Sequence, residues 1–374
     1  MNVPKLRFKE FNDEWSYQSL SKYVNRITTK NKNNESNLVL TISAQYGLVD
    51  QTNFFNRSVS SSNLTGYYLL NNGDFAYNKS YSNGYPWGAV KRLNKYNQGV
   101  VSSLYICFKP NDLINSDFLE QYFETNKWYQ QISEVSVEGA RNHGLLNIAV
   151  NDFFNTKHYI PSIKEQEKIS NFLSLLDKKI ELQSKKIEDL KLFKKGLSTT
   201  IFNSLRDFEE YKLGKICNIT TGKLDANAMI DNGKYRFYTC AKEYSFIDKY
   251  AFDTEALLIS GNGAYVGYIH YYKGRFNAYQ RTYVLDNFSQ NIQFIKCYLD
   301  ENLAKRINSE KKEGNTPYIV LSTLSDMVIK IPSKENQIKI SNIINYHNKK
   351  IELEENKLLK LQKFKKGLMQ NMFV

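Results

Sequence analysis

The chain has 374 residues, enough for two or three domains, and its 41% hydrophobic and 14% aromatic residues can fill real cores. No run approaches the roughly 18 apolar residues of a membrane span, and the N-terminus lacks an apolar export segment, so we expect a soluble, cytoplasmic protein. The formal net charge of +13 favours a polyanionic partner, most often nucleic acid, although an AT-rich genome would also enrich lysine.

Residues from about 14 to 160 are predicted to form a first globular segment in which short strands dominate. Runs typical of strands occupy residues 37–43, 67–70, 75–78 and 100–108, and turns rich in Asn and Gly separate them. An amphipathic helix is predicted at about 116–133, and an extended stretch at 148–160 closes the segment.

A long helix follows, and the sequence contains it twice. One copy runs from Pro161 to Phe202 and the other from Pro332 to Phe373; they align without a gap, and about half of the positions are identical. Both copies carry residues at alternating spacings of four and three, which is the repeat of a coiled-coil seam. The apolar seam residues are Ile169, Leu173, Leu176, Ile180, Ile187, Leu190, Leu197, Ile340, Ile344, Ile351, Leu358, Leu361 and Leu368.

Polar residues interrupt this seam at equivalent places, namely Gln183, Lys194, Glu354 and Lys365. A helix of this length would measure about 60 Å, and a single apolar stripe does not stabilise it alone. The natural partner of each copy is the other one, in antiparallel pairing. The alternative is that each helix is buried in a separate globular core.

The helix starts also carry signals. Ser162 followed by Glu165 is typical of a capping box, in which the Glu side chain reaches back to the helix entry. Ser333 repeats the cap, but Asn336 stands in the place of the Glu.

The second globular segment, about 206–331, repeats the order of the first with different residues. Strands are predicted at 256–260, 266–272 and 282–285, a helix at 292–308, and an extended stretch at 319–331. Its entry at 211–216 resembles the entry of the first segment at 15–24. We therefore predict domain 1 at 1–160, the first long helix at 161–205, domain 2 at 206–331 and the second long helix at 332–374.

Signals for catalysis are weak in both segments. The glycine-rich stretch 261–267 departs from the dinucleotide-binding pattern, and no phosphate-binding loop or serine-nucleophile motif is present. The four cysteines and four histidines show no metal-ligand spacing, so we expect neither a zinc site nor a disulfide framework. The chain is therefore not expected to be an enzyme, and no cofactor or metal is expected in it.

Loops that mix cations, aromatic rings and amides are better candidates for contacts with DNA. Such side chains can neutralise phosphates and form hydrogen bonds with base edges, although any one cluster can also be a solvated loop. In the first segment the candidates are Lys79, Tyr81, Asn83, Tyr85, Lys91, Arg92, Arg141, Asn142 and His143. In the second they are Asn262, Tyr265, Lys273, Arg275, Tyr279, Gln280, Arg281, Lys311, Lys312, Asn315 and Thr316.

The duplicated plan of domain and helix, with the repeated sequences KKIEL and FKKGL, resembles the specificity subunit of Type I restriction-modification systems. The resemblance covers essentially the whole chain. It implies an α+β protein with a pseudo-two-fold repeat: two mixed target-recognition domains separated by a long antiparallel two-helix coiled coil. It also implies a bipartite, interrupted site on double-stranded DNA.

The same resemblance implies that two methyltransferase (modification) subunits dock on the helices. Restriction and translocase subunits join the larger complex. S-adenosylmethionine, ATP and Mg would then be bound by these partners. The rival interpretation is a coiled-coil scaffold for protein partners that does not bind DNA.

Overall fold

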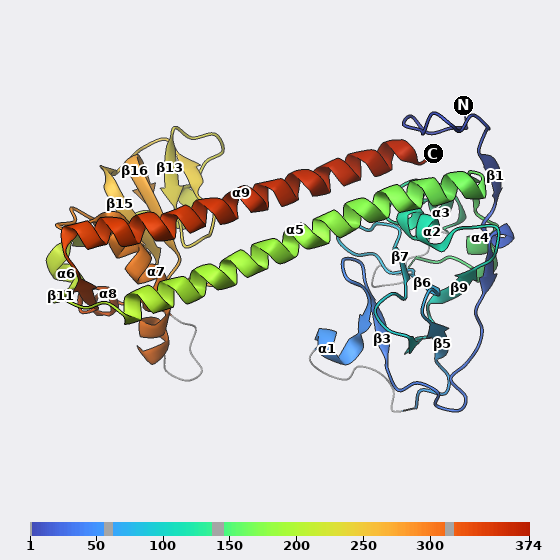
Figure 1. Cartoon of the computed structure of the whole chain (residues 1–374), viewed down its shortest axis with the longest axis horizontal. Helices are drawn as coiled ribbons and strands as arrows, with labels where there is room; N and C mark the ends of the chain where they lie inside the picture. The colour runs from blue at the N-terminus through green and yellow to red at the C-terminus, as the bar shows by residue number, and fades with distance from the viewer. Residues whose placement is uncertain (1, 56–62, 137–145, 311–317) are drawn as a thin grey trace. The chain divides into compact units, whose positions relative to one another are not determined.

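The computed structural model describes residues 2–55, 63–136, 146–310 and 318–374 (Figure 1). They form two compact units, one of residues 1–183 with 357–374 and the other of residues 184–356. Each unit holds one globular part and about half of each long helix, α5 (Ile163–Asn203) and α9 (Lys334–Met372). The predicted boundaries after residues 160, 205 and 331 stay a prediction.

In unit 1, a four-stranded antiparallel sheet in the order β2-β9-β6-β7 separates two cores. Phe75 and Tyr77 of β6 enter the larger core, while Ala76 enters the smaller one, because successive side chains of a strand point to opposite faces. The strands are β1 (Ser16–Ser19), β2 (Val24–Arg26), β3 (Leu40–Ser43), β4 (Gly47–Asp50), β5 (Tyr68–Asn71), β6 (Phe75–Asn78), β7 (Ala89–Arg92), β8 (Gln98–Val101), β9 (Ile106–Pro110) and β10 (Lys157–Ile160).

The predicted strand at 100–108 is two strands, because β8 pairs with β5 whereas β9 pairs with β6 and β2. The chain turns between them, where the Tyr105 amide donates a 3.1 Å hydrogen bond to the Ser102 carbonyl. The predicted extended stretch at 148–160 also contains a helix before its strand. The helices of this domain are η1 (Leu20–Lys22), α1 (Gln51–Phe55), α2 (Ser116–Phe123), α3 (Tyr129–Val135) and α4 (Val150–Asn155).

The helix predicted at 116–133 is interrupted between α2 and α3. The Thr125 hydroxyl donates to the Tyr122 carbonyl at 2.6 Å, and the Trp128 indole donates to the Phe123 carbonyl at 3.2 Å. These side chains satisfy carbonyls of the last turn of α2, and Trp128 is buried in the core. Burial of one large aromatic ring therefore ends the helix that the periodicity predicted to continue.

Unit 2 is built on a six-stranded sheet in the order β12-β17-β15-β16-β13-β14. Leu257 and Ile259 of β15 enter the core that contains α7, while Ala256 and Leu258 enter a smaller core on the other face. The elements are β11 (Glu209–Lys212), α6 (Leu213–Ile216), β12 (Asn218–Thr221), η2 (Ala226–Ala228), β13 (Tyr235–Tyr238), β14 (Ser245–Ile247), β15 (Phe252–Ser260), β16 (Ile269–Ala278), β17 (Thr282–Asp286), α7 (Ile292–Glu310), α8 (Leu321–Ser325) and β18 (Val328–Ile331).

The similarity of the two domain entries has a structural counterpart. In unit 1 the entry strand β1 pairs antiparallel with β10, the strand that leads into α5. In unit 2 the entry strand β11 pairs in the same way with β18, which leads into α9. In both units, the first and last strands of the domain therefore pair with each other next to the start of a long helix. Helix α8 interrupts the extended stretch that was predicted at 319–331.

Helices α5 and α9 pack side by side and run in opposite directions (Figure 1). In unit 1 Lys365 reaches Asp177 at 2.5 Å, and in unit 2 Lys186 reaches Glu354 at 2.9 Å. Every apolar seam residue is buried or partly buried, as the spacing predicts. Lys365 and Glu354, two of the polar interruptions, thus form ion pairs between the helices.

Each domain docks on the helix pair through the same two side chains. The buried Gln166 accepts a 2.7 Å hydrogen bond from the Asn115 amide and donates at 2.9 Å to the Pro161 carbonyl. Gln337, its equivalent in the second copy, does the same in unit 2 with Asn291 and Pro332.

The second repeated contact is aromatic. Phe373, near the end of α9, packs on Phe118 of α2 with ring centroids 5.3 Å apart. Phe202, near the end of α5, packs on Phe294 of α7 at 6.0 Å and on Tyr298 at 5.3 Å. Each domain therefore contacts the start of one long helix and the end of the other. This arrangement confirms the predicted mixed α/β fold with internal repetition.

The predicted capping role of Glu165 is wrong. Its carboxylate is buried and forms a double hydrogen bond with the Arg7 guanidinium, at 2.7 and 2.8 Å. An N-terminal segment thus crosses the start of α5, and the Leu6 amide also reaches the Asn371 carbonyl at 2.9 Å. Asn336, the equivalent of Glu165, is exposed.

Candidate nucleic-acid interface

The loop that joins β6 to β7 presents aromatic and amide side chains at the surface of unit 1. Its tip turns at Gly84, and Tyr81 and Asn83 are exposed there. Gly88 closes the loop with a positive φ of 77°, and a Cβ there would lie 2.2 Å from the Asn78 carbonyl oxygen. Only glycine fits at this position, so the loop conformation is built into the backbone.

The basic and aromatic residues that flank this tip are held by the fold. Lys79 donates to the Ile148 carbonyl at 3.1 Å, and Tyr85 is partly buried, which raises the pKa of its phenol. Lys91 is only 7% exposed and forms a 2.5 Å ion pair with Glu124. Its charge is matched within the domain.

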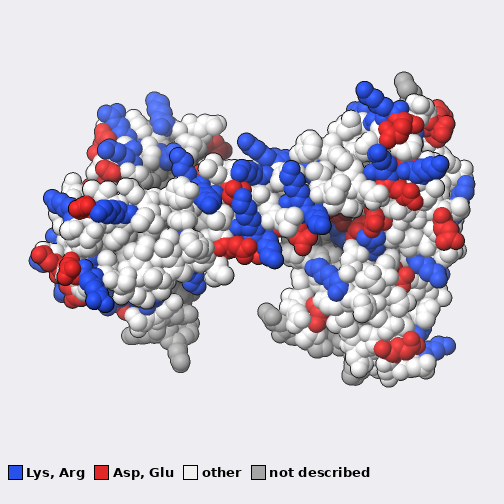
Figure 2. Space-filling view, viewed as in Figure 1, with Lys and Arg blue, Asp and Glu red and all other residues white. Residues whose placement is uncertain are grey.

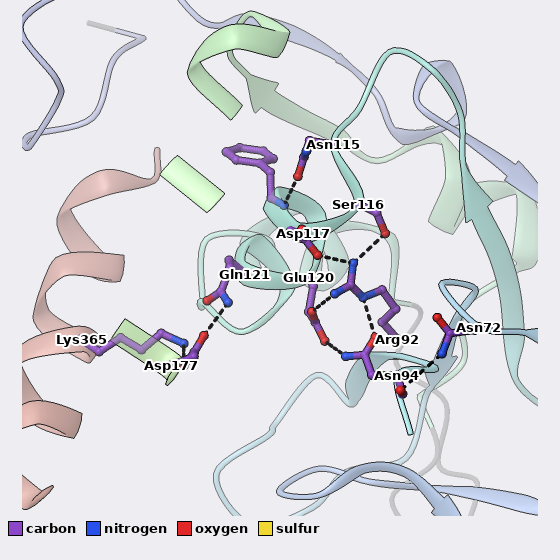
Figure 3. Close-up of polar contacts among 11 residues, drawn as sticks. Asn72, Arg92, Asn94, Asn115, Ser116, Asp117, Glu120, Gln121, Asp177 and Lys365 are labelled. Atoms are coloured by element: carbon purple, nitrogen blue, oxygen red, sulfur yellow. Dashed lines mark hydrogen bonds and ion pairs between the residues drawn. The ribbon is translucent and has the colours of Figure 1, made fainter. Parts of the chain in front are cut away.

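Arg92 lies at the centre of a polar network that ties β7 to α2 (Figure 3). Its guanidinium contacts Asp117 at 2.7 Å and Glu120 at 2.6 Å, and donates to the Ser116 hydroxyl at 2.9 Å. Burial raises the pKa of Glu120, while the charge of Arg92 opposes the shift. Arg92 thus positions α2, and its interactions leave little of its charge for a phosphate.

A second part of the network in Figure 3 links α2 to both long helices. Gln121 donates at 2.8 Å to Asp177 of α5, and Asp177 also accepts from Lys365 of α9 at 2.5 Å. These contacts form one wall of a cleft of about 960 Å³ between domain 1 and the helices in unit 1. The cationic side chains that line it are Lys91, Arg92, Lys95, Lys365 and Lys366, and the acidic ones are Glu120, Glu124 and Asp177.

Lysines are also concentrated on the long helices. From residue 356 to the C-terminus the sequence contains five lysines and no acidic residue. In the space-filling view, blue side chains gather over the helical segments (Figure 2). The last part of α9 in unit 1 is therefore a strongly positive surface, to which phosphates would be attracted.

In unit 2, two of the predicted loops meet at one end of the sheet. The Gly261 amide donates to the Arg281 carbonyl at 2.9 Å, which brings the turn between β16 and β17 beside the glycine loop. Tyr265 and Arg281 are exposed, whereas Asn262 and Tyr279 are partly buried. Gln280 is exposed, and its amide donates to Asp225 at 2.6 Å. The predicted set from this end of the sheet is therefore contiguous.

Lys273 and Arg275 do not belong to that cluster. They lie along β16, opposite Glu255 and Asp253, with which they form ion pairs of 3.5 and 3.0 Å. Glu255 precedes Gly261 by six residues, which is about 20 Å of extended strand. Their exposed ion pairs are weak, so both cations stay accessible to solvent.

Seven candidates lie outside the described residues. They are Arg141, Asn142, His143, Lys311, Lys312, Asn315 and Thr316. Conversely, Arg236 of β13 was not among the predicted residues, although its guanidinium carbon lies 4.3 and 4.5 Å from the centroids of two tyrosine rings. The local signal is one arginine among three aromatic residues in β13, and it does not stand out in a chain so rich in aromatic residues.

Within the residues that the structure describes, none of the helices combines the length and apolar character needed to span a membrane. In the same ranges, no three His, Cys, Asp or Glu side chains are grouped so that they could hold a metal ion.

Comparison with known proteins adds to this geometry. Residues 206–363 match the model of the Type I restriction modification DNA specificity domain. This part of the chain is therefore similar to the specificity proteins of Type I restriction-modification systems. The matched stretch contains domain 2 together with most of α9, the helix that duplicates α5. The resemblance predicted from KKIEL and FKKGL is thereby confirmed.

Among relatives, the specificity subunit of the Type I restriction enzyme EcoDI from Escherichia coli is 39% identical over 135 residues. That match covers 36% of this chain and only 30% of the relative. Similarity of fold extends over the whole chain. The S subunit of a Type I restriction-modification system from M. genitalium aligns with a TM-score of 0.62 at 19% identity, over 100% of this chain and 99% of that one.

A second solved structure, described as showing complex assembly and conformational transition of a type I R-M system, aligns with a TM-score of 0.59 at 13% identity. It covers 98% of this chain and 99% of the other. At these identities the alignments establish the fold alone.

Proposed function

We propose that this chain is the DNA-recognition subunit of a Type I restriction-modification complex. Each domain reads one half of a bipartite, interrupted site on double-stranded DNA, and the helix pair sets the spacing of the halves. The chain itself is not a catalyst. Two methyltransferase subunits supply S-adenosylmethionine and adenine methylation, and restriction and translocase subunits use ATP and Mg. The complex acts in the cytoplasm.

The observation that carries this proposal is the repeated attachment of unlike domains to like helices. Gln166 and Gln337 make the same hydrogen bonds, and Phe202 and Phe373 make the same aromatic contacts. The sheets that they hold differ in strand number and order. A DNA site with two different half-sequences requires two different recognition domains on one common scaffold.

The exposed candidates are the best DNA contacts, because their side chains are available to a ligand. Phosphate contacts would provide most of the affinity, and base contacts the discrimination. Lys91 and Arg92 are excluded from this set, since acidic neighbours match their charge. The proposed contact residues are Tyr81, Asn83, Lys95, Tyr265, Lys273, Arg275, Gln280, Arg281 and Lys366.

Binding to DNA can be tested with the full chain in complex with its methyltransferase partner. The expected affinity for duplex DNA falls steeply with salt, with a log–log slope of about −5 if six phosphates are neutralised. Sequencing methylated adenines in cells that contain the complex should then give one bipartite motif. A scaffold for protein partners alone would show neither result, and their joint absence would refute the proposal.

The docking face for the methyltransferases is proposed from apolar residues that stay exposed at equivalent places in both helices. Leu175, Leu182 and Phe193 of α5 correspond to Tyr346, Leu353 and Phe364 of α9, and each is more than half exposed. Spacings of 7 and 18 residues place them on one face of a helix. Exposed apolar groups that recur on one face are typical of a protein interface.

The exposed residues of the two helices combine within each unit. In unit 2, Phe193 of α5 lies 5.2 Å from the ring of His347 on α9, whose other neighbour is the exposed Tyr346 at 5.3 Å. Leu353 follows one heptad later. Unit 1 contains the equivalent set of Leu175, Leu182 and Phe364. Two equivalent faces imply two copies of one partner.

Native mass spectrometry of the reconstituted complex tests this docking face. Leu182→Glu should remove one methyltransferase subunit, Leu353→Glu should remove one, and the double variant should remove both. Leu192→Glu is the matched control, because Leu192 is equally exposed but its counterpart in the second copy is Lys363. Loss of partners from the control, or their retention in the double variant, would contradict the assignment.

A further inference from the structure

The guanidinium of Arg236 lies against two aromatic rings in unit 2. Its central carbon lies 4.3 Å from the ring centroid of Tyr244 and 4.5 Å from that of Tyr272. Arg236 is on β13, Tyr272 on the neighbouring β16, and Tyr244 in the loop before β14. Three separate segments of the chain thus converge on one cation.

The polar contacts of Arg236 are unusually few. Its Nη1 donates to the Tyr238 hydroxyl at 3.4 Å, and no other hydrogen bond or ion pair of this side chain occurs among the described residues. The other arginines that are stacked or buried have carboxylate partners: Arg275 has Asp253, and Arg92 has Asp117. The Nε–Nη2 edge of Arg236 therefore keeps two donors for a ligand.

The position of Arg236 fits contact with an external group. The side chain is partly exposed, and Tyr244 is 37% exposed beside it. The aromatic surface continues to Phe246, whose ring lies 5.5 Å from that of Tyr244. A rigid, planar pair of donors surrounded by aromatic surface matches the edge of a base better than a single phosphate oxygen, for which a flexible lysine would suffice.

We infer that Arg236 reads a guanine in one half of the DNA site, with its Nε–Nη2 edge directed to the O6 and N7 acceptors of that base. Contact with the two tyrosine rings restricts the guanidinium before DNA binds, so less conformational entropy is lost on contact. Tyr238 acts as a positioning residue through its hydroxyl. This inference rests on the proposed function and names a specificity residue within it.

The experiment uses the full chain with its methyltransferase partner. The wild-type complex first selects its site from a randomised duplex library, and affinities are then measured for duplexes changed at one base pair. Arg236→Lys keeps the charge but loses the planar pair of donors. It should lower discrimination at one G·C pair, in one half-site only, by roughly 5- to 150-fold.

Two further variants separate reading from folding. Tyr238→Phe removes only the orienting hydroxyl and should lower discrimination at the same base pair severalfold. Arg206 is an exposed arginine in the linker after α5, and Arg206→Lys should leave discrimination at every base pair unchanged. If Arg236→Lys weakens binding to all duplexes equally, or leaves the profile of the selected site intact, the inference is refuted while the proposed function stands. A wild-type complex that selects no site would instead refute the proposed function.

Discussion

The two buried glutamines permit a test in which each half of the chain is the control for the other. Replacing Gln166 by Leu removes the acceptor for the Asn115 amide and the donor to the Pro161 carbonyl, which lie 2.7 and 2.9 Å away. The Pro161 carbonyl would then be buried, and the Asn115 amide partly buried, without this partner. Each costs about 1–3 kcal/mol, so the docking of α2 on α5 should lose about 2–6 kcal/mol.

Gln337→Leu makes the equivalent change in unit 2, where Asn291 and Pro332 lose their partners. Native-state hydrogen exchange, followed by mass spectrometry, measures the effect separately for α2 and α7. Gln166→Leu should accelerate exchange in α2 by at least about 30-fold, and Gln337→Leu should do so in α7, each without changing the other helix. Gln130→Leu, on the exposed surface of α3, should change the opening free energy of neither α2 nor α7 by more than about 0.5 kcal/mol.

The reasoning would be refuted by either of two results. If neither variant accelerates exchange in its own helix, the glutamines do not hold the domains on the helix pair. If both variants accelerate exchange in both helices to the same extent, the two docking contacts are not independent, contrary to their placement in separate compact units.

Further predictions concern a histidine, an ion pair and the helix length. Burial lowers the pKa of His158 to about 3, so between pH 6.5 and 3 the unfolded chain binds more protons than the folded chain. As pH falls through this range, the free energy of unfolding of unit 1 should therefore decrease by up to about 1.4 kcal/mol per pH unit. Urea unfolding against pH should show this slope, and His158→Ile with Tyr122→Phe should flatten it; an unchanged slope would contradict the assignment. Arg7→Ala should lower the free energy of unfolding in urea by about 3–5 kcal/mol, because it leaves the buried Glu165 carboxylate unpaired. Glu10→Gln, at an exposed ion pair, should have little effect on it, and equal effects of the two variants would argue against the buried pair. Four residues inserted into both long helices lengthen each by about 6 Å, so the interval between methylated adenines should grow by about two base pairs, and an unchanged interval would exclude the helices as the spacer.

The long helices could be predicted from the sequence because their signal is local. A seam with alternating spacings of four and three needs only neighbouring residues to define it, and the seam side chains are indeed buried or partly buried. Individual β-strands in the domains were also predicted, since alternation has a period of two. The break after α2 was missed, because it depends on Trp128 finding space in a core that no local pattern reveals.

The candidate site was harder to predict because its charges are settled by distant partners. Lys91 and Arg92 follow one another in a loop-like sequence that is typical of phosphate binding, yet Glu124 and Asp117 take up their charges. Arg7 lies 158 residues from Glu165, and nothing near either residue indicates the pair. Arg236 shows the reverse: its proposed role rests on the absence of a carboxylate partner among the described residues, which only the three-dimensional contacts reveal.

The repeat itself indicates which contacts belong to the helix pair and which to the individual domains. Identical pairs, such as Gln166 with Gln337, make the same contact in both units. Pairs that differ follow domain-specific contacts: His158 binds Tyr122 and Thr156, whereas Ile329 takes its place in the other half. A domain can therefore be exchanged if it brings the backbone amide that the glutamine binds and the aromatic surface that the terminal phenylalanine covers. The part of its surface that the helix pair does not contact, including any base-reading side chain, is then free to change.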